Sequence, residues 1–309
     1  TPYLPDFSWD EPEMLDAQLE DALWWIERFD LDGLRVDAVP MMPRFVTRHL
    51  TARVHRRFEG LRTRQYLVGE TFTDAFGYDV VRYYLGADGL DGQFDFPLMW
   101  ATRAVLADEV EPMWTLADAW RESEAAWAGS AAVMANFVGN HDVPRFISAA
   151  AGQLGEWHDP WTDPLSPPED DPVAYDRLVM AQTFALTMPG AAVLFQGDEY
   201  GEPGAYDPDN RHLMRFAEDR SAFEAEAARR IGLLGRARTC LPALRRGDLH
   251  LLREEAERLT YLRALDDGAP AAVVLSRDPA ATRAEVPLPA AVRVDAEAFV
   301  DVFSGRRIP

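Results

Sequence analysis

Five short apolar runs alternate with longer segments of helical periodicity along this chain, and that alternation restricts its fold more than any other feature. The apolar runs, predicted to be strands, span residues 33–39, 66–71, 90–96, 131–138 and 191–196. Helices are predicted over residues 11–29, 43–58, 98–109, 114–127, 173–187 and 222–239. Repetition of strand, loop and helix indicates an α/β fold with a parallel sheet and right-handed crossovers. The strands are nearly all apolar, as expected where helices cover both faces of a sheet.

The polar residues at the strand ends separate two architectures that this pattern allows, a doubly wound sheet and part of a (β/α)8 TIM barrel. Asp37, Glu70 and the pair His141 and Asp142 each follow the C-terminal end of a different predicted strand. Barrel enzymes carry their chemistry at that end. We therefore interpret residues 1–245 as the C-terminal five βα units of the barrel, and expect a longer native chain to supply the missing N-terminal segment.

The sequence changes character after about residue 247. Apolar runs over 249–252, 259–265 and 271–275 alternate there with turn-rich segments. Such alternation is typical of antiparallel strands. We expect residues 246–309 to form a small C-terminal β-sandwich domain.

Composition narrows the classes of partner. The chain has 31 Lys and Arg against 52 Asp and Glu, a net charge of -21, which disfavours nucleic acid and membrane surfaces as partners but not a neutral sugar. No apolar run approaches the roughly 20 residues of a membrane span. The single cysteine, Cys240, excludes an internal disulfide, and its apolar helical surroundings predict a buried structural thiol. The sequence does not indicate the cellular compartment.

The strand-end residues have the chemistry that cleavage of a glycosidic bond needs, namely one carboxylate at the anomeric carbon and one acid at the leaving oxygen. Arg35 and Asp37 lie on the same side of their strand, so the guanidinium can orient that carboxylate. Glu70 ends an apolar strand, where partial burial favours a general acid. Asp142 with His141 can hold sugar hydroxyls. Each pattern alone fits a structural role, but three strand-end carboxylates together favour an active site.

Several segments also resemble conserved regions of glycoside hydrolase family 13, the α-amylase family. Gly-Leu-Arg-Val-Asp-Ala-Val at 33–39, Val-Gly-Glu-Thr at 68–71 and Phe-Val-Gly-Asn-His-Asp at 137–142 are similar to its second, third and fourth regions. Weaker similarities lie at residues 4–7, 196–201 and 207–211. The resemblance runs from residue 3 to about residue 240.

The resemblance implies a role for each matching residue. Asp37 would be the nucleophile that forms a β-glycosyl-enzyme. Glu70 would protonate the leaving oxygen and then activate water. Asp142 would grip hydroxyls of the distorted −1 sugar, with Arg35 and His141 as its polar partners.

Further binding residues are weaker expectations. Asp209 and Arg211 would lie near the donor-side subsites. Trp9, Trp157 and Trp161 are candidates for stacking on sugar faces, with core packing as the alternative for each.

The chain also departs from the family pattern. The first conserved region, Asp-x-x-x-Asn-His, is absent, and its Asn helps to hold a structural calcium in the family. The resemblance therefore implies no metal site in this chain and no cofactor for the chemistry, with a structural calcium in the full-length protein bound by ligands outside this chain. Residues 38–41 read Ala-Val-Pro-Met rather than the Lys-His of many α-amylases, and resemble trehalose-synthase-like or α-glucosidase-like members.

These observations predict a retaining α-glycoside hydrolase that acts on α-1,4-linked glucans or maltooligosaccharides. Three alternatives stay open: an α-glucosyl transferase or isomerase of the same family, a non-catalytic relative, and a Mg²⁺-dependent barrel enzyme. Arg35 beside Asp37 disfavours the last, because a fixed cation opposes a divalent ion. Chain-length preference, linkage, endo or exo action and oligomeric state are not set by the sequence.

Overall fold

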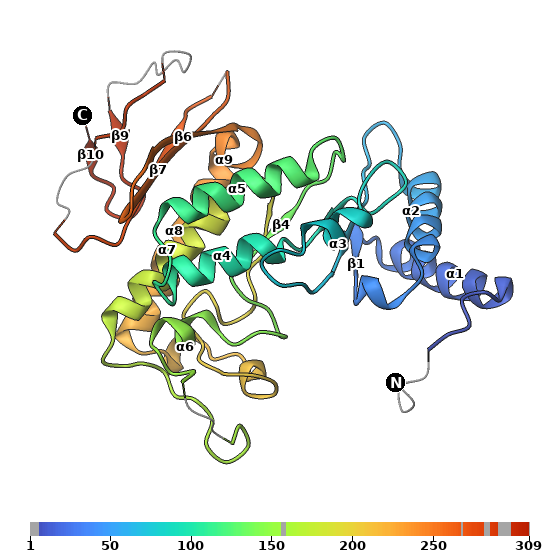
Figure 1. Cartoon of the computed structure of the whole chain (residues 1–309), viewed down its shortest axis with the longest axis horizontal. Helices are drawn as coiled ribbons and strands as arrows, with labels where there is room; N and C mark the ends of the chain where they lie inside the picture. Colours follow the sequence, from blue (N-terminus) through green and yellow to red (C-terminus); the bar gives the residue numbers. More distant parts are fainter. Residues whose placement is uncertain (1–5, 156–158, 267, 281–284, 290–297, 309) are drawn as a thin grey trace. The chain divides into compact units, whose positions relative to one another are not determined.

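The computed structural model describes residues 6–155, 159–266, 268–280, 285–289 and 298–308 (Figure 1). They form two compact units, described separately below. The first unit lies within Thr1–Pro97 and Glu122–Ala135, and the second within Leu98–Arg121 and Asn136–Pro309.

The first unit is built on a parallel sheet. Its elements are α1 (Pro12–Phe29), β1 (Gly33–Val36), the 3-10 helix η1 (Val39–Met41), α2 (Arg44–Phe58), β2 (Tyr66–Gly69), α3 (Tyr78–Tyr83) and β3 (Gly92–Gln93). The strand order is β1-β2-β3, and both pairings are parallel. Ala135 extends this arrangement through a parallel bridge to Phe94. The parallel α/β prediction is confirmed for these strands.

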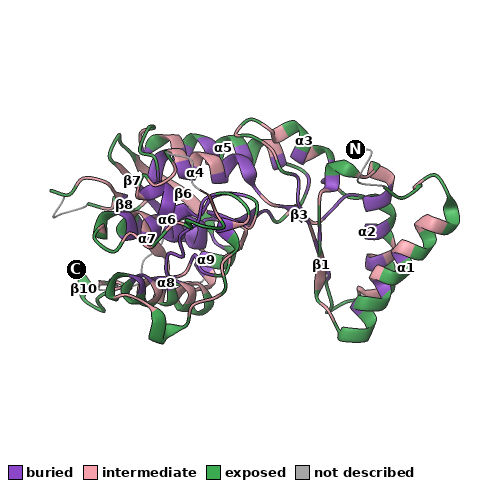
Figure 2. Cartoon of the chain, turned by 90° about the horizontal axis from the view of Figure 1, so that it is seen from below, coloured by how far each residue is buried: buried purple, intermediate pink, exposed green. Residues whose placement is uncertain are grey.

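One face of α1 makes the core of the first unit. Leu19, Leu23 and Ile26 recur at helical spacing and are 2–3 % exposed, and they pack with Val36 and Leu67 of the sheet. Full burial of such a side chain stabilises the fold by roughly 1.5–3 kcal/mol. Figure 2 shows buried positions on both α1 and α2.

Close approach of the first two strands depends on a glycine. A Cβ on Gly33 would lie 1.9 Å from the carbonyl oxygen of Tyr66, so no larger residue fits without moving the backbone. This contact holds β1 beside β2 at the start of the ladder.

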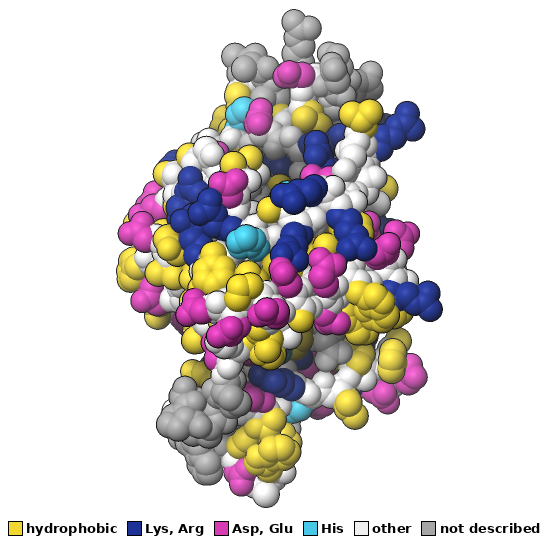
Figure 3. Space-filling view, turned by 90° about the vertical axis from the view of Figure 1, so that its right-hand side faces the viewer, with side chains coloured by type: hydrophobic (Ala, Val, Ile, Leu, Met, Phe, Trp, Pro, Cys, Tyr) yellow, Lys and Arg dark blue, Asp and Glu magenta, His cyan; other side chains and the backbone are white. Residues whose placement is uncertain are grey.

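The outer surfaces of α1 and α2 are joined by ion pairs. Arg53 contacts Asp16 and Glu20, and Arg57 contacts Glu20 and Glu27. Basic and acidic side chains accordingly lie side by side on the face drawn in Figure 3. Exposed pairs of this kind each stabilise a fold by about 1 kcal/mol or less.

The second unit packs helices around one large core. Three elements continue from one unit into the other: α4 (Phe96–Leu106) lies in the second unit from Leu98, α5 (Trp114–Trp127) up to Arg121, and β4 (Ala135–Asn136) from Asn136. The further elements up to residue 246 are α6 (Phe146–Ala150), α7 (Pro172–Thr187), β5 (Ala191–Ala192), the 3-10 helices η2 (Asp209–Arg211) and η3 (Ala217–Asp219), α8 (Ala222–Cys240) and α9 (Pro242–Arg246). Strands β4 and β5 are neighbours. Eleven of the sixteen residues of α7 and all five residues of α6 are buried, and Figure 2 shows buried residues gathered where α6 and α7 pack.

An antiparallel sheet follows the helices. It consists of β6 (Asp248–Glu254), β7 (Arg258–Ala264) and β8 (Ala271–Ser276), and β9 (Phe299–Val300) pairs with β10 (Arg307–Ile308). The Tyr261 hydroxyl lies 2.6 Å from Thr187 Oγ1 at the end of α7, and the buried Arg263 donates to the Thr187 carbonyl. Sheet and helices thus share one core. The C-terminal antiparallel sheet is confirmed, while the domain boundary at 245/246 stays a prediction.

The predicted helices match within a few residues, but the predicted strands are too long. The runs over 131–138 and 191–196 contain only β4 and β5, of two residues each. Ala131 has a φ of 57°, which is incompatible with an extended strand. More generally, an apolar run indicates that a segment is buried, but it does not show that the segment pairs with a neighbouring strand. The expectation of a buried Cys240 was wrong: it ends α8 and is exposed.

Among the described residues, no helix combines the length and apolar character needed to cross a membrane.

Candidate active site

Strand register places the first two predicted carboxylates next to each other. Val36 pairs with Gly69 at the ends of β1 and β2, so Asp37 and Glu70 follow paired positions on neighbouring parallel strands. Such strands lie about 4.8 Å apart. The two carboxylates therefore leave the sheet at the same edge, as the sequence predicted.

Glu70 is fixed by the turn that follows Asp37. The Ala38 amide donates to Glu70 Oε2 at 2.9 Å, and backbone bonds join Val39 to Glu70 and Glu70 to Val36 at 2.9 and 2.8 Å. Ala38 takes a left-handed conformation, with φ 42° and ψ 46°, which is costly for a residue with a Cβ. That turn aims the Ala38 amide at the carboxylate. Glu70 is 5 % exposed, so its carboxyl group is largely withdrawn from water.

Asp37 is in a different environment. Its side chain is 71 % exposed and forms an ion pair with Arg35 Nη1. The Arg35 guanidinium also lies 5.9 Å from the centre of the Phe94 ring. One carboxylate is thus exposed and oriented by a cation, and the other is buried and held by a backbone amide, a division suited to a nucleophile and a proton donor.

In the second unit, Asp142 is held by two neighbours. His141 Nε2 lies 3.2 Å from Asp142 Oδ2, and Arg211 Nη2 lies 3.3 Å from Asp142 Oδ1. Arg211 Nε also donates to the His141 carbonyl oxygen and faces Asp207 Oδ1, each at 3.1 Å. The Asp142 amide donates to Asn140 Oδ1 at 2.9 Å. The predicted residues His141, Asp142 and Arg211 therefore form one cluster.

The structure places Asp209, predicted near the donor-side subsites, inside its own loop. It is 1 % exposed, and its carboxylate accepts from the amides of Ala205 at 2.7 Å and Leu165 at 3.3 Å. His212 Nε2 lies 3.0 Å from Oδ1. These contacts make Asp209 a support for the segment that carries Arg211, and its role toward a sugar stays a prediction.

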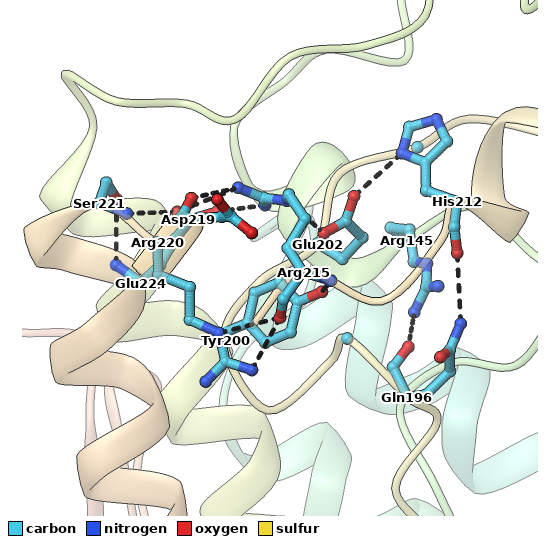
Figure 4. Close-up of polar contacts among 12 residues, drawn as sticks. Arg145, Gln196, Tyr200, Glu202, His212, Arg215, Asp219, Arg220, Ser221 and Glu224 are labelled. Carbon is cyan, nitrogen blue, oxygen red and sulfur yellow. Dashed lines mark hydrogen bonds and ion pairs between the residues drawn. The ribbon is translucent and has the colours of Figure 1, made fainter. Parts of the chain in front are cut away.

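A polar network that sequence reasoning missed continues from His212 (Figure 4). His212 Nδ1 lies 3.0 Å from Glu202 Oε1, and Arg215 Nε donates to Glu202 Oε2 at 2.8 Å. Arg215 also binds Glu224, which completes the capping box of α8 with Ser221. The network thereby joins the loop after β5 to the start of α8. Buried acids with no apolar periodicity around them give no clear sequence signal.

The pKa values in this network are shifted in opposite directions. The hydrogen bond to Glu202 raises the pKa of His212, burial opposes the rise, and Asp209 adds to it. Burial alone would raise the pKa of Glu202, but the bonds from His212 and Arg215 hold it below its usual value. With a carboxylate against each ring nitrogen, the charged imidazolium is the form that satisfies both contacts.

These shifts predict a pH-dependent contribution to stability. The stabilisation from His212 is complete below the usual pKa of 6.5 and is lost as pH rises through its raised value. That from Glu202 is complete above 4.5 and is lost as pH falls through its lowered value. The measurement compares the melting temperatures of the wild type and His212→Asn. We expect the largest difference between pH 4.5 and pH 6.5, and a smaller difference in alkaline buffer. A difference independent of pH would contradict this assignment.

A buried ion pair also supports the second unit. Arg145 and Asp198 are 1 % and 2 % exposed at the side chain, with Nη1 3.0 Å from Oδ1. Burial raises the pKa of Asp198 to about 6, and Arg145 opposes that rise. Arg145 further donates to the carbonyl oxygens of Gln196 at 2.7 Å and Asn210 at 2.9 Å. The pair therefore ties the loop after β5 to the segment that follows Asp142.

The tryptophans give mixed results. Trp9 is half-buried and packs edge-on against Phe7, with ring centres 5.6 Å apart. Trp161 is 80 % exposed, and Trp157 lies outside the described residues. Tyr206, which precedes the Arg211 partner Asp207, is 69 % exposed and is a stacking candidate that the sequence analysis did not select.

The sequence-predicted residues thus form two groups, one in each unit. Asp37, Arg35 and Glu70 lie together in the first, and His141, Asp142 and Arg211 in the second. No cluster of three or more His, Cys, Asp or Glu side chains within the described part of the chain has the arrangement of a metal site.

Comparisons with known proteins agree with these motifs. Residues 1–241 match the family model of the α-amylase catalytic domain. A cyclomaltodextrinase of Geobacillus thermopakistaniensis is 25 % identical over 99 % of this chain and 46 % of its own length. A maltogenic α-amylase of Bacillus acidopullulyticus is 26 % identical over 72 % of this chain and 33 % of its own.

Solved structures agree as well. The acarbose complex of a Geobacillus thermoleovorans α-amylase has a TM-score of 0.69 and 26 % identity, covering 88 % of this chain and 55 % of its own. A cyclic α-maltosyl-(1→6)-maltose hydrolase of Arthrobacter globiformis shares the fold, with a TM-score of 0.72 and 24 % identity over 90 % of this chain and 55 % of its own. The chain spans about half the length, or less, of these relatives. With a family match over residues 1–241 and the strand-end carboxylates inside it, the chain belongs to the α-amylase family of glycoside hydrolases.

Proposed function

We propose that this chain carries the catalytic carboxylates of a retaining α-glycoside hydrolase that acts on α-1,4-linked glucans or maltooligosaccharides. The observation that carries the proposal is the register of β1 and β2, which brings Asp37 and Glu70 to the same edge of the sheet in unlike environments. A pair of carboxyl groups, one as nucleophile and one as acid and base, is what retaining hydrolysis requires.

In the proposed reaction, Asp37 attacks the anomeric carbon while the bond to the leaving oxygen breaks. Glu70 gives its proton to that oxygen, and a β-glycosyl-enzyme forms. Glu70, now a carboxylate, takes a proton from water, and the hydroxide attacks the same carbon to release Asp37. Two inversions restore the α configuration, and protons and charges balance over the cycle.

The remaining residues act on the sugar ring in this proposal. Asp142 accepts hydrogen bonds from sugar hydroxyls, and His141 donates to the same ring. Arg211 keeps Asp142 oriented, as Arg35 does for Asp37. Hydrogen bonds that become stronger in the transition state lower the barrier, whereas bonds that are equally strong in the ground state and the transition state do not.

The names of the relatives support the substrate class. They include cyclomaltodextrinase, maltogenic α-amylase and neopullulanase, names that refer to cyclomaltodextrin, maltose and pullulan. Cyclomaltodextrin glucanotransferases of Bacillus licheniformis and Niallia circulans are also 26 % identical, which keeps glucosyl transfer as the second candidate. Hydrolysis is preferred because the described residues of this chain do not identify an acceptor site.

The architecture belongs to the same proposal. The parallel strands would form the C-terminal five βα units of a (β/α)8 barrel, completed by an N-terminal segment of a longer native chain. The share of the relatives that this chain spans supports that view. A structural calcium would then take its ligands from the N-terminal segment, and no cofactor takes part in the reaction.

The test is a product profile, measured with the native chain including its N-terminal segment, on maltoheptaose, pullulan and maltose. We expect reducing sugar from maltoheptaose as shorter maltooligosaccharides. Products longer than the substrate would favour the transferase. No action on any glucan, or activity that EDTA abolishes and Mg²⁺ alone restores, would overturn the proposal.

A further inference from the structure

The side chain of Asn210 binds the backbone on both sides of Asp142, and Arg211 adds a bond to one of these sides. Asn210 Nδ2 donates to the carbonyl oxygens of His141 and Val143, each at 2.9 Å. These two residues flank Asp142 in the chain. Asn210 is 0 % exposed, so water does not compete for either bond.

The amide nitrogen of Asn210 matches the chemistry of the two acceptors. Both are carbonyl oxygens, which cannot donate, so only a group with two N–H donors satisfies them together. The amide oxygen of Asn210 has no hydrogen-bond partner among the described residues. The side chain is therefore placed by its two donors, at the cost of a buried acceptor left unpaired.

The segment around Asn210 is itself fixed. The carbonyl oxygen of Asn210 accepts from Arg145 Nε at 2.9 Å, and Arg145 also donates to the carbonyl oxygen of Gln196 (Figure 4). A Cβ on Gly204 would lie 2.4 Å from the carbonyl oxygen of Asp209, so the absence of a side chain at Gly204 permits the close approach of these two parts of the loop. These contacts hold the segment that carries Asn210 in place, which is what a residue needs in order to position another.

We propose that Asn210 is a positioning residue for Asp142: by bridging the carbonyl groups of His141 and Val143 it sets where the Asp142 carboxylate meets the sugar. The inference rests on the proposed function and adds to it a residue that touches no substrate. Without the bridge, Asp142 can shift while the chain stays folded. A displacement of about 1 Å at a reacting centre can cost about 10²-fold in rate.

The variants Asn210→Ser, Asn210→Ala and Asn210→Asp test the proposal in the native full-length chain, with kcat, KM and melting temperature measured on maltoheptaose. The serine variant keeps one donor, the alanine variant keeps none, and the aspartate variant places a carboxylate against the two carbonyl oxygens. We expect kcat to fall in that order, by about 10²-fold for Asn210→Ala, with KM changed little. The reason is that the bonds from Asp142 to the distorted ring are stronger in the transition state than in the ground state, so their loss lowers kcat more than it changes KM.

The matched control is Asn136→Ala. Asn136 is 3 % exposed, and its Nδ2 donates to the Pro189 carbonyl at 2.7 Å, so this variant also removes a buried amide bond, but one that does not involve the residues flanking Asp142. We expect it to lower the melting temperature with kcat unchanged.

The outcomes separate the two proposals. A folded Asn210→Ala with wild-type kcat, or a kcat loss in Asn136→Ala equal to that in Asn210→Ala, would overturn the positioning role alone. If Asn210→Ala and Asn210→Asp do not fold, Asn210→Ser decides in the same way. A wild-type chain without action on any α-glucan would overturn the proposed function, and the positioning role with it.

Discussion

Glu70→Gln should lower the rate of maltoheptaose hydrolysis by about 10²–10⁴-fold, the usual contribution of a general acid and base. The substitution keeps the shape of the side chain and an oxygen that can accept from the Ala38 amide. It removes the proton that the leaving oxygen needs and the base that activates water. The measurement is kcat on maltoheptaose, together with the melting temperature.

A substrate whose leaving group departs without a proton distinguishes the two steps. With α-maltosyl fluoride, Glu70→Gln should form the glycosyl-enzyme readily but hydrolyse it slowly, giving a burst of fluoride. Glu59→Gln is the control: Glu59 is also a partly buried acid of the first unit, and it accepts from the Gln65 amide at 3.0 Å. It should keep wild-type turnover. Unchanged turnover in Glu70→Gln would exclude it as the acid.

Arg145→Met should have the largest effect on stability, a loss of about 3–5 kcal/mol in the free energy of unfolding. The substitution leaves Asp198 buried without its cation and leaves the carbonyl groups of Gln196 and Asn210 without a donor. Burial already raises the pKa of Asp198 to about 6, so without Arg145 the carboxyl group should take up a proton at still higher pH.

Chemical denaturation at several pH values measures this effect. The double variant Arg145→Met with Asp198→Leu should recover part of the loss, since no uncompensated charge is left in the core. Arg229→Met removes an exposed pair with Glu226 and should change almost nothing. An Arg145→Met chain as stable as the wild type would show that the pair does not support this unit.

The positions of the carboxylates were predictable because parallel strands end at a common edge. Asp37 and Glu70 each follow an apolar run, and the register of Val36 with Gly69 then leaves them little freedom. The antiparallel strands near the C-terminus were predictable for a similar reason, since alternation and turn residues are local signals.

Other features depend on contacts between distant residues, which the sequence does not display. Nothing local marks Ala38 as left-handed, and the turn in this conformation makes bonds to the distant residue Glu70. Asp209 lies in a segment that resembles the family and was expected near the donor-side subsites, and its carboxylate contacts the Ala205 amide and His212. Asn210 is one residue from the predicted Arg211, yet its role appears only when the carbonyl groups it bridges are seen.

Mass spectrometry of the trapped intermediate tests the central claim, that Asp37 is the nucleophile, most directly. Glu70→Gln in the native full-length chain is treated with α-maltosyl fluoride, denatured in acid and cleaved after arginine. Residues 36–44 form one peptide, in which Asp37 carries the sole side-chain carboxyl group. A maltosyl adduct on that peptide is the predicted result. Fluoride release without any adduct, or an adduct on a different peptide, would contradict the account.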